Sequence, residues 1–388
     1  MTHSRSSISP GAEPERDPAI VFGVLLRDAL EDWPGRNQLM LALSKKRTVV
    51  LLERRRSGQI PRTRVERVQD HLYVARNAFV LRSSRLGHIW PVLAMIDATI
   101  LHHEMKRAGI RNFVLWLTAV DPTLAFRVPD GALVYDCADP NFLPQEDSDF
   151  EQRERGLATR AKVTVSTAHS LLRKMKSYND LSILLPNATS ADFHPSAISN
   201  LPRPELLRSR TGPVVGYMGT VDWRFDPAMV SAAARALPDC TFAVVGRVNH
   251  DQEHSLRELR EQPNVVISGQ VDYDAGRAWV AAFDIGLIPF RINSINDAIN
   301  PVKMYMYLMA GLPIVATDIE ECRLNPFVIT AASGDEFTAA IDKSLKELPA
   351  RDREHRVDYA LRNTWEARAD EAVTLLRANG LLGVARSD

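Results

Sequence analysis

A lysine at the start of an expected helix is the first residue whose position suggests chemistry. The segment NPVKMYMYLMAGLP begins at Asn300. We expect a helix over residues 301–310, with Asn300 as its N-cap and Pro301 in its first position. Lys303 then lies in the first turn, where the helix dipole makes a lysine unfavourable by ~0.3–1 kcal/mol. Free backbone N–H groups and an ammonium together bind phosphate, so the segment predicts an anion site unless the lysine extends into water.

A second candidate anion site is the segment GYMGT, which follows an apolar run expected to be a strand. Gly216 and Gly219 would let backbone N–H groups approach a phosphate closely, and Thr220 ends the segment. No third glycine completes the GxGxxG motif, so a nicotinamide-dependent dehydrogenase is poorly supported. A tight turn without a ligand is the alternative.

Two aspartates in the segment VYDCADP could act as a base. Asp136 and Asp139 follow an apolar run that we expect to be a strand, and open α/β sheets bind their ligands at the carboxyl ends of strands. A carboxylate in such a place can take the proton of an attacking hydroxyl. The alternative is a structural role, because Asp-Pro commonly starts a turn.

These residues are positioned by strands that alternate with helices along the chain, which predicts parallel βαβ units and doubly wound sheets. We expect one such domain over residues 19–189 and a second over residues 212–364. Between them, residues 190–211 contain three prolines and little periodicity, so we expect a linker. Two domains of this kind enclose a central cleft, where a ligand would bind.

The bulk composition fits a globular protein of two domains. The chain has 388 residues, and 48 basic residues balance 48 acidic ones, so net charge favours no particular partner. Its three cysteines form no CxxC pair, which argues against a zinc site and fits a reducing compartment. Residues 1–18 are polar, lack the apolar core of a signal peptide and are expected to be a disordered tail. No apolar run reaches the ~20 residues that span a bilayer, so we expect a cytoplasmic protein.

The second half of the chain resembles the donor-binding domain of nucleotide-sugar glycosyltransferases of the GT-B fold. The resemblance rests on five segments in order: GYMGTVDWRFD, TFAVVGRV, NVVISGQVDYD, AAFDIGLIPF and NPVKMYMYLMAGLPIVATD. Three segments of the first half resemble the acceptor domain of the same family: LVYDCADPNF, AKVTVSTAHSL and LLPNATSADFHP. The nearest pattern is that of transferases that build bacterial surface polysaccharides. The resemblance covers most of residues 19–380.

This resemblance implies two Rossmann-like domains that face a central cleft, with the donor bound mainly to the C-terminal one. It implies a nucleoside-diphosphate-sugar as co-substrate, no further cofactor and usually no metal. It also implies that residues 365–388 form a helix that crosses back onto the first domain. The acceptor would be a glycan or a lipid-linked glycan.

One departure from the family concerns two glutamates. The large retaining group carries one glutamate near the donor sugar and another that binds the ribose, and the matching positions here are Ala298 and Met306. The xanthan glucuronosyltransferase type, an inverting branch, also lacks this pair and directs a lysine of the same helix toward the nucleotide phosphates. Lys303 matches that lysine, and Met306 would be a neutral wall near the nucleoside or part of the core.

The resemblance also suggests roles for other residues. Asp139 becomes the first choice for the base and Asp136 the second, if the reaction inverts the anomeric carbon. A loop with Val271 and Tyr273 would bind the nucleoside base, although it could be an ordinary loop in which Asp274 caps the next helix. The expected donor-binding set, in which the two arginines are secondary and could be solvated instead, is Gly219, Thr220, Arg224, Arg247, Val271, Tyr273, Asn300, Lys303 and Met306.

The basic stretch ERRRSGQIPRTRVER, whose arginines extend from Arg54 to Arg67, has two interpretations. It is either a solvated loop or a contact with anionic lipid head groups at the inner face of the cytoplasmic membrane, worth about 1 kcal/mol per residue. Trp90 and its aliphatic neighbours would then be an interfacial anchor. Nucleic acid is disfavoured, because no aromatic residues interrupt the basic run.

We therefore expect a glycosyltransferase of bacterial surface polysaccharide or glycoconjugate synthesis. Two alternatives stay open from the sequence alone. One is a nucleotide-sugar epimerase of the same fold, which acts without an acceptor. The other is a catalytically inactive scaffold subunit of a polysaccharide-assembly complex, which the replacement of both glutamates keeps open.

Overall fold

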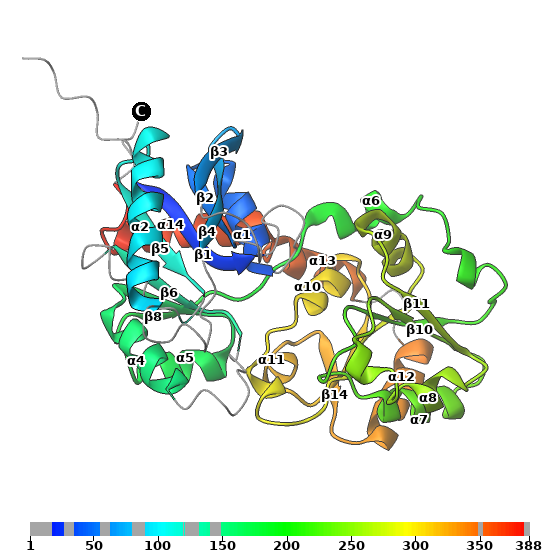
Figure 1. The fold of residues 1–388 in the computed structure, drawn as a ribbon. Helices are drawn as coiled ribbons and strands as arrows, with labels where there is room; N and C mark the ends of the chain where they lie inside the picture. Colours follow the sequence, from blue (N-terminus) through cyan, green and yellow to red (C-terminus); the bar gives the residue numbers. More distant parts are fainter. Residues whose placement is uncertain are drawn as a thin grey trace, which may run out of the picture.

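The computed structural model describes residues 18–26, 35–54, 63–79, 90–118, 120, 132–139, 149–347 and 352–383. The described residues form two α/β units, each built around its own sheet (Figure 1). This confirms the predicted fold class of two doubly wound domains. Almost all of the expected tail, residues 1–18, lies outside the described residues.

The first domain has an eight-stranded sheet in the order β3-β4-β2-β1-β5-β6-β7-β8. All neighbouring strands are parallel except the pair β3 and β4. The strands are β1 (Ala19–Leu26), β2 (Val49–Arg54), β3 (Arg64–Gln69), β4 (Leu72–Phe79), β5 (Phe113–Leu117), β6 (Leu133–Cys137), β7 (Val163–Ser166) and β8 (Ser182–Leu184). The helices are α1 (Gly35–Ser44), α2 (Trp90–Arg107), α4 (Phe150–Arg160) and α5 (His169–Lys176).

Strand β3 is a feature that the sequence analysis did not expect, because it lies in the basic stretch. It pairs with β4 at the edge of the sheet, and almost every residue of it is exposed. An exposed edge strand has no apolar alternation, so its sequence does not distinguish it from a solvated loop. Arg55, Arg56 and Arg62 of the same stretch lie outside the described residues.

The second domain has a six-stranded, fully parallel sheet in the order β11-β10-β9-β12-β13-β14. Its strands are β9 (Val214–Met218), β10 (Thr241–Val245), β11 (Val265–Gly269), β12 (Ile285–Ile288), β13 (Ile314–Thr317) and β14 (Val328–Ala331). Its helices are α7 (Pro227–Ala236), η4 (His250–Gln252), α8 (Arg257–Arg260), α9 (Tyr273–Ala281), η5 (Asn296–Ala298), α10 (Val302–Met309), α11 (Glu320–Arg323), α12 (Gly334–Glu347) and α13 (Arg353–Leu361).

The segment between the sheets has short helices of its own. It contains η2 (Ala191–Phe193), α6 (Pro195–Ile198) and η3 (Glu205–Leu207). Phe193, Ile198 and Leu207 are buried in the core of the second domain. The segment expected to be a linker is thus packed on the second domain along much of its length.

The last helix, α14 (Trp365–Ala378), packs with the first domain. Trp365, Ala369 and Leu376 are buried in the same core cluster as Leu39 of α1 and Trp116 of β5. Figure 1 shows α14, in red, among the blue and cyan elements of that domain. The chain therefore crosses between the domains a second time at the start of α14. Among the residues that the structure describes, no helix is long and apolar enough to cross a membrane.

Candidate active site

The side chain of Lys303 lies in the first turn of α10, against the carboxyl edge of the second sheet. Its Nζ is 4.4 Å from the centre of the Phe290 ring and 5.1 Å from the centre of the Tyr217 ring. A Cβ atom placed on Gly219 would be 3.1 Å from Cε of Lys303 and 3.5 Å from Nζ. Lys303 therefore meets the turn after β9, as expected for two parts of one anion site.

The surroundings of Lys303 destabilise the charged form of its amine. Desolvation by the dense surroundings, followed by the charge of Arg224, lowers the pKa of Lys303 to about 7. Within the described part of the chain, no carboxylate is within ion-pair distance of Nζ. The charge of Asp222 favours the charged lysine in part, but this carboxylate is bonded to Arg224. A half-buried cation with no ion pair among the described residues is suited to bind an anion.

The start of α10 differs from the expectation in one respect. Pro301 is the N-cap, and no side chain caps this helix. The predicted cap, Asn300, is buried and turned to other partners: its side-chain oxygen accepts from Asn187 N at 3.1 Å, and its Nδ2 donates to Tyr305 Oη at 3.2 Å and Glu321 Oε2 at 3.0 Å. The first-turn N–H groups of α10 thus lack a side-chain cap. The side-chain amide of Asn300 is occupied by protein partners and is not available to bind a sugar donor.

The two glycines of GYMGT have different roles. Gly219 follows β9 with φ +145°, a backbone conformation that favours glycine, and its N–H donates to the Val245 carbonyl at 2.9 Å. Gly216 lies inside β9, where a Cβ would be 2.3 Å from the Phe283 ring. The proposal that Gly216 helps to bind phosphate is therefore wrong, because this glycine allows a close approach of Phe283 to the strand.

Arg224 is fixed beside this site by an aspartate. Its Nε donates to Asp222 at 2.9 and 3.0 Å, and its Nη2 contacts the same carboxylate. Although desolvation opposes it, the Arg224 guanidinium lowers the pKa of Asp222, so this carboxylate is charged near neutral pH. Arg224 also lies 5.8 Å from the centre of the Phe290 ring, which Lys303 contacts as well. Two cations are thus held near one aromatic ring.

Of the two aspartates, only Asp139 is accessible. It is an exposed residue beyond the end of β6, yet nearby protein desolvates its carboxyl and raises its pKa, while the charge of Arg224 lowers it in part. Because Arg224 belongs to the second domain, Asp139 lies within electrostatic range of one donor-binding candidate across the domains. This arrangement is compatible with the predicted base.

Asp136 is instead a structural residue of the first domain. It is fully buried in β6, where Oδ1 accepts from Arg36 Nη2 at 2.9 Å and Oδ2 accepts from Trp116 Nε1 at 2.8 Å. Burial raises the pKa of Asp136, and the two donors oppose this shift. With both oxygens occupied and no exposed surface, Asp136 does not fit the predicted base.

The remaining predicted residues are placed around the site or away from it. Thr220 accepts at its carbonyl from Tyr217 Oη at 2.7 Å, and Arg247 is exposed beyond the end of β10. Tyr273 starts α9, which Asp272 caps instead of Asp274, and its hydroxyl donates to Asp192 at 3.1 Å. Val271 packs on the core beside it.

The two positions that matched the missing glutamates are both buried. Met306 is 8% exposed within the core of the second domain, so the structure favours the core interpretation. Ala298 is 8% exposed and packs in the core cluster of the first domain, with Ala168 and Leu171. A carboxylate at either place would lie among apolar side chains.

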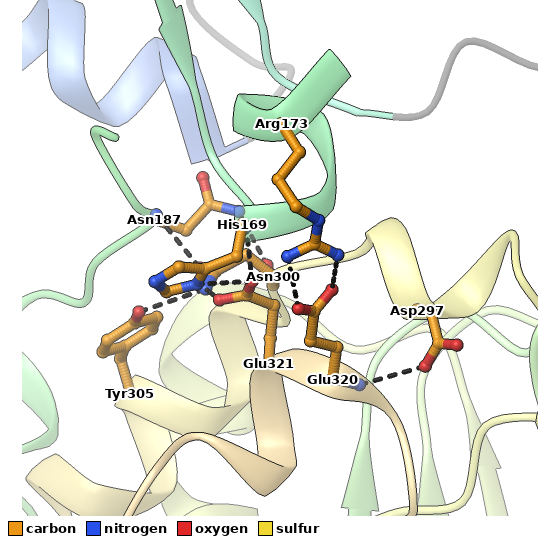
Figure 2. A network of polar contacts seen from close by, with 8 residues as sticks. All are labelled: His169, Arg173, Asn187, Asp297, Asn300, Tyr305, Glu320 and Glu321. Carbon is orange, nitrogen blue, oxygen red and sulfur yellow. Dashed lines mark hydrogen bonds and ion pairs between the residues drawn. The ribbon is translucent and has the colours of Figure 1, made fainter. Parts of the chain in front are cut away.

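The structure also reveals a polar network between the domains that sequence reasoning missed (Figure 2). Its centre is Glu321 at the start of α11, which is 5% exposed and contacts His169 and Asn300. Beside it, Arg173 Nη1 and Nη2 donate to the two oxygens of Glu320 at 2.7 and 2.8 Å. His169 follows β7 and Glu321 follows β13. Their position after the ends of strands was the one feature of the sequence that could have indicated this network.

No cluster of three or more histidine, cysteine, aspartate or glutamate side chains suited to a metal ion occurs in the described ranges. Around Lys303 and Arg224, the fixed cations and the backbone donors at the start of α10 are suited to bind an anion.

The comparison with protein families fits this arrangement. Residues 212–347 match the family model described as Glycosyl transferases group 1. The second domain is a group 1 glycosyltransferase domain. The matched range includes all strands of the second sheet, together with Gly219, Arg224 and Lys303.

A relative of known assignment matches over part of this chain. The glycosyltransferase TuaH of Bacillus subtilis (strain 168), assigned to teichuronic acid biosynthesis, is 32% identical over 155 residues. The matching region covers 39% of this chain and 39% of TuaH. The similarity of sequence thus extends over less than half of either protein.

Solved structures resemble the whole chain and not only its glycosyltransferase domain. Sucrose-phosphate synthase from Thermosynechococcus elongatus superposes with a TM-score of 0.70 at 16% identity, over 94% of this chain and 99% of that one. HepE of Anabaena, in complex with UDP and glucose, gives 0.67 at 16% identity, over 94% and 100%. These likenesses show that the chain has the GT-B fold.

Proposed function

We propose that this protein transfers a sugar from a nucleoside-diphosphate-sugar to a glycan or lipid-linked acceptor in bacterial surface polysaccharide synthesis. The observation that carries the proposal is Lys303, a half-buried ammonium against Gly219 with Arg224 nearby. This pair of cations lies within a group 1 glycosyltransferase domain. The relative TuaH, which belongs to teichuronic acid biosynthesis, supports the class of product.

In this reaction the donor loses a nucleoside diphosphate. As the bond between the anomeric carbon and the diphosphate oxygen breaks, negative charge grows on that oxygen. Lys303, Arg224 and the N–H groups at the start of α10 would stabilise this charge, as preorganised donors do in other enzymes. These residues would neutralise the leaving group without a metal ion.

We propose Asp139 as the base. Its carboxylate would take the proton of the acceptor hydroxyl while the hydroxyl oxygen forms the new bond to the anomeric carbon, which inverts that carbon. Asp139 is exposed at the end of β6, and its pKa is raised by desolvation, toward the range in which a base works best. Burial of alanine and methionine at the two glutamate positions of retaining relatives also favours inversion.

The nucleotide is proposed to be UDP. HepE binds UDP in its solved complex, and it covers 94% of this chain in the superposition. UDP is therefore the first ligand to test, before other nucleoside diphosphates.

A peripheral contact with an anionic membrane is proposed for the first domain. Val92, Met95 and Ile96 share one face of α2 and are 57%, 49% and 50% exposed. Helix α2 contacts β3, which presents the exposed Arg64 and Arg67. Apolar side chains next to basic ones suit the interface of an anionic bilayer. Sedimentation with anionic and zwitterionic vesicles tests this contact, and equal binding of Met95→Glu and wild type would contradict it.

A panel of nucleotide sugars tests the main proposal. A donor should raise the melting temperature of the protein, because it binds only the native state, and the labelled sugar should appear in a polysaccharide or lipid fraction. Isomerisation of a donor without acceptor would indicate an epimerase instead. If no member of the panel raises the melting temperature, the protein is a scaffold and the proposal is wrong.

A further inference from the structure

The helix α5 of the first domain receives its N-terminal cap from the second domain. Ala168 holds the N-cap position of α5 and has no side chain that could cap it. Instead, Glu321 Oε1 accepts from the His169 backbone N–H at 2.7 Å and from His169 Nδ1 at 3.0 Å. Its second oxygen accepts from Asn300 Nδ2 at 3.0 Å, so both carboxylate oxygens are bonded (Figure 2).

The burial of Glu321 makes this contact specific. The residue is 5% exposed, and a buried carboxylate is stable only where hydrogen bonds or cations replace its water. The start of α5 provides both an N–H group that has no acceptor within the helix and the positive end of a helix dipole. If the domains moved apart here, the carboxylate would have to find water or other donors.

Other contacts reinforce the same junction. Asn187, at the exit from the first domain, donates from Nδ2 to the Asn300 carbonyl at 2.8 Å. Asp297 accepts from the backbone N–H of Glu320 at 3.0 Å, which fixes the start of α11 against η5. Ala298 of η5 packs with Ala168 and Leu171 beneath α5. The junction thus combines polar and apolar contacts.

This junction connects directly to the residues proposed for catalysis. Asn300, bonded to Glu321, is three residues before Lys303. On the other side, His169 follows β7, whose last residue Ser166 pairs with Cys137 at the end of β6. Asp139 is two residues beyond Cys137. A short path therefore runs from the base, through Glu321, to the lysine.

We propose that Glu321 is a positioning residue. It fixes the relative orientation of the two domains, one of which carries Asp139 and the other Arg224 and Lys303. The inference rests on the proposed glycosyl transfer, because it concerns the alignment of acceptor and donor. An error of about 1 Å in such an alignment can reduce a rate about 100-fold.

The variants Glu321→Ala and Glu321→Gln test this role, with Glu347→Gln as the matched control. Glu321→Ala should lower kcat about 100-fold and change the Kd for UDP less than threefold, because Lys303 and Gly219 belong to the second domain. Glu321→Gln retains an oxygen for His169 and should recover part of kcat. Glu347→Gln, on α12 of the second domain, loses only an ion pair with the exposed Lys343 and should behave like wild type.

Two measurements on the full chain do not depend on activity. Hydrogen exchange of the α5 amides should accelerate in Glu321→Ala, and small-angle scattering should show a larger radius of gyration, while Glu347→Gln changes neither. Unchanged exchange and scattering in a folded Glu321→Ala, or an unchanged kcat, would overturn the inference. Absence of UDP binding by the wild type would instead contradict the proposed function and leave the exchange result to decide on the junction.

Discussion

The ammonium of Lys303 lies 4.4 Å from the centre of the Phe290 ring. The ring attracts the cation, but it does not neutralise it as a carboxylate would. Lys303 is therefore oriented in the ligand-free protein and still has its charge available for an anion. A lysine in the first turn of α10 is unfavourable for the helix dipole, and its contact with Phe290 connects this position to the proposed binding of a diphosphate.

The same relationship predicts a cost in stability. The pKa of Lys303 is about 7 in the folded protein, whereas an unfolded lysine has a pKa near 10.5. Between these values the unfolded state binds more protons, so the contribution of Lys303 to stability rises with pH and is least favourable below pH 7. Lys303→Met should raise the melting temperature at pH 6, by about 2–4 °C for each kcal/mol regained. Scanning fluorimetry at pH 6 and pH 9.5 should show that this gain shrinks at high pH, and a gain that grows with pH would contradict it.

Affinity for UDP should depend on pH in the opposite direction. The diphosphate favours the charged lysine, so binding should weaken about tenfold for each pH unit above 7 until the pKa of the complex is reached. Titrations at pH 7 and pH 8.5 measure this change. Lys303→Met is the control, because it retains any ionisation of UDP itself. The same pH dependence of UDP binding in wild type and variant would contradict the proposal that charged Lys303 binds the diphosphate.

Replacement of the proposed base should affect the chemical step alone. Asp139→Asn should lower kcat about 10²–10⁴-fold, with little change in the Kd for UDP. In the wild type, kcat/KM should fall as the pH drops through the pKa of Asp139, which desolvation raises from its ordinary value. A variant that keeps a third or more of the wild-type kcat would rule out Asp139 as the base.

Asp136 should matter for stability. Asp136→Leu leaves the buried Arg36 guanidinium without its carboxylate and should lower the free energy of unfolding by about 3–5 kcal/mol. The double variant Arg36→Met/Asp136→Leu removes both charges and should lose less, because a buried pair can be replaced by apolar residues. Urea unfolding of the two variants measures this, and a single variant within about 1 kcal/mol of wild type would show that the pair is dispensable.

Much of the fold could be predicted from sequence, because apolar runs indicate buried strands and a helical spacing of apolar residues indicates helices with one buried face. The strand at Ala19–Leu26 and the helix around Lys303 are examples, and the glycosyltransferase fold followed from the order of motifs. Strand β3 could not be predicted in this way, since its exposed residues carry no period. Residues 190–211 were expected to be a plain linker, and only the structure shows Phe193 and Leu207 in a core.

The candidate site was predictable where it depended on local rules and not where it depended on distant partners. Lys303 and Gly219 follow from the chemistry of a helix start and a strand end. Asp136 and Asp139 look alike in sequence, and only the structure separates them, through burial of Asp136 and its contacts with Trp116 and with Arg36, 100 positions away. Likewise, Asn300 resembles an N-cap until Asn187 and Glu321 are seen to occupy its amide.

Calorimetric titration of UDP into the wild type, Lys303→Met and Lys343→Met tests the central claim most directly. Lys343 is an exposed lysine of α12 and serves as the matched control. A charged hydrogen bond contributes about 1.5–3 kcal/mol, so Lys303→Met should weaken UDP binding about 10–150-fold at pH 7. Lys343→Met should bind UDP as the wild type does. Equal affinity of wild type and Lys303→Met would contradict the claim that Lys303 holds the donor diphosphate.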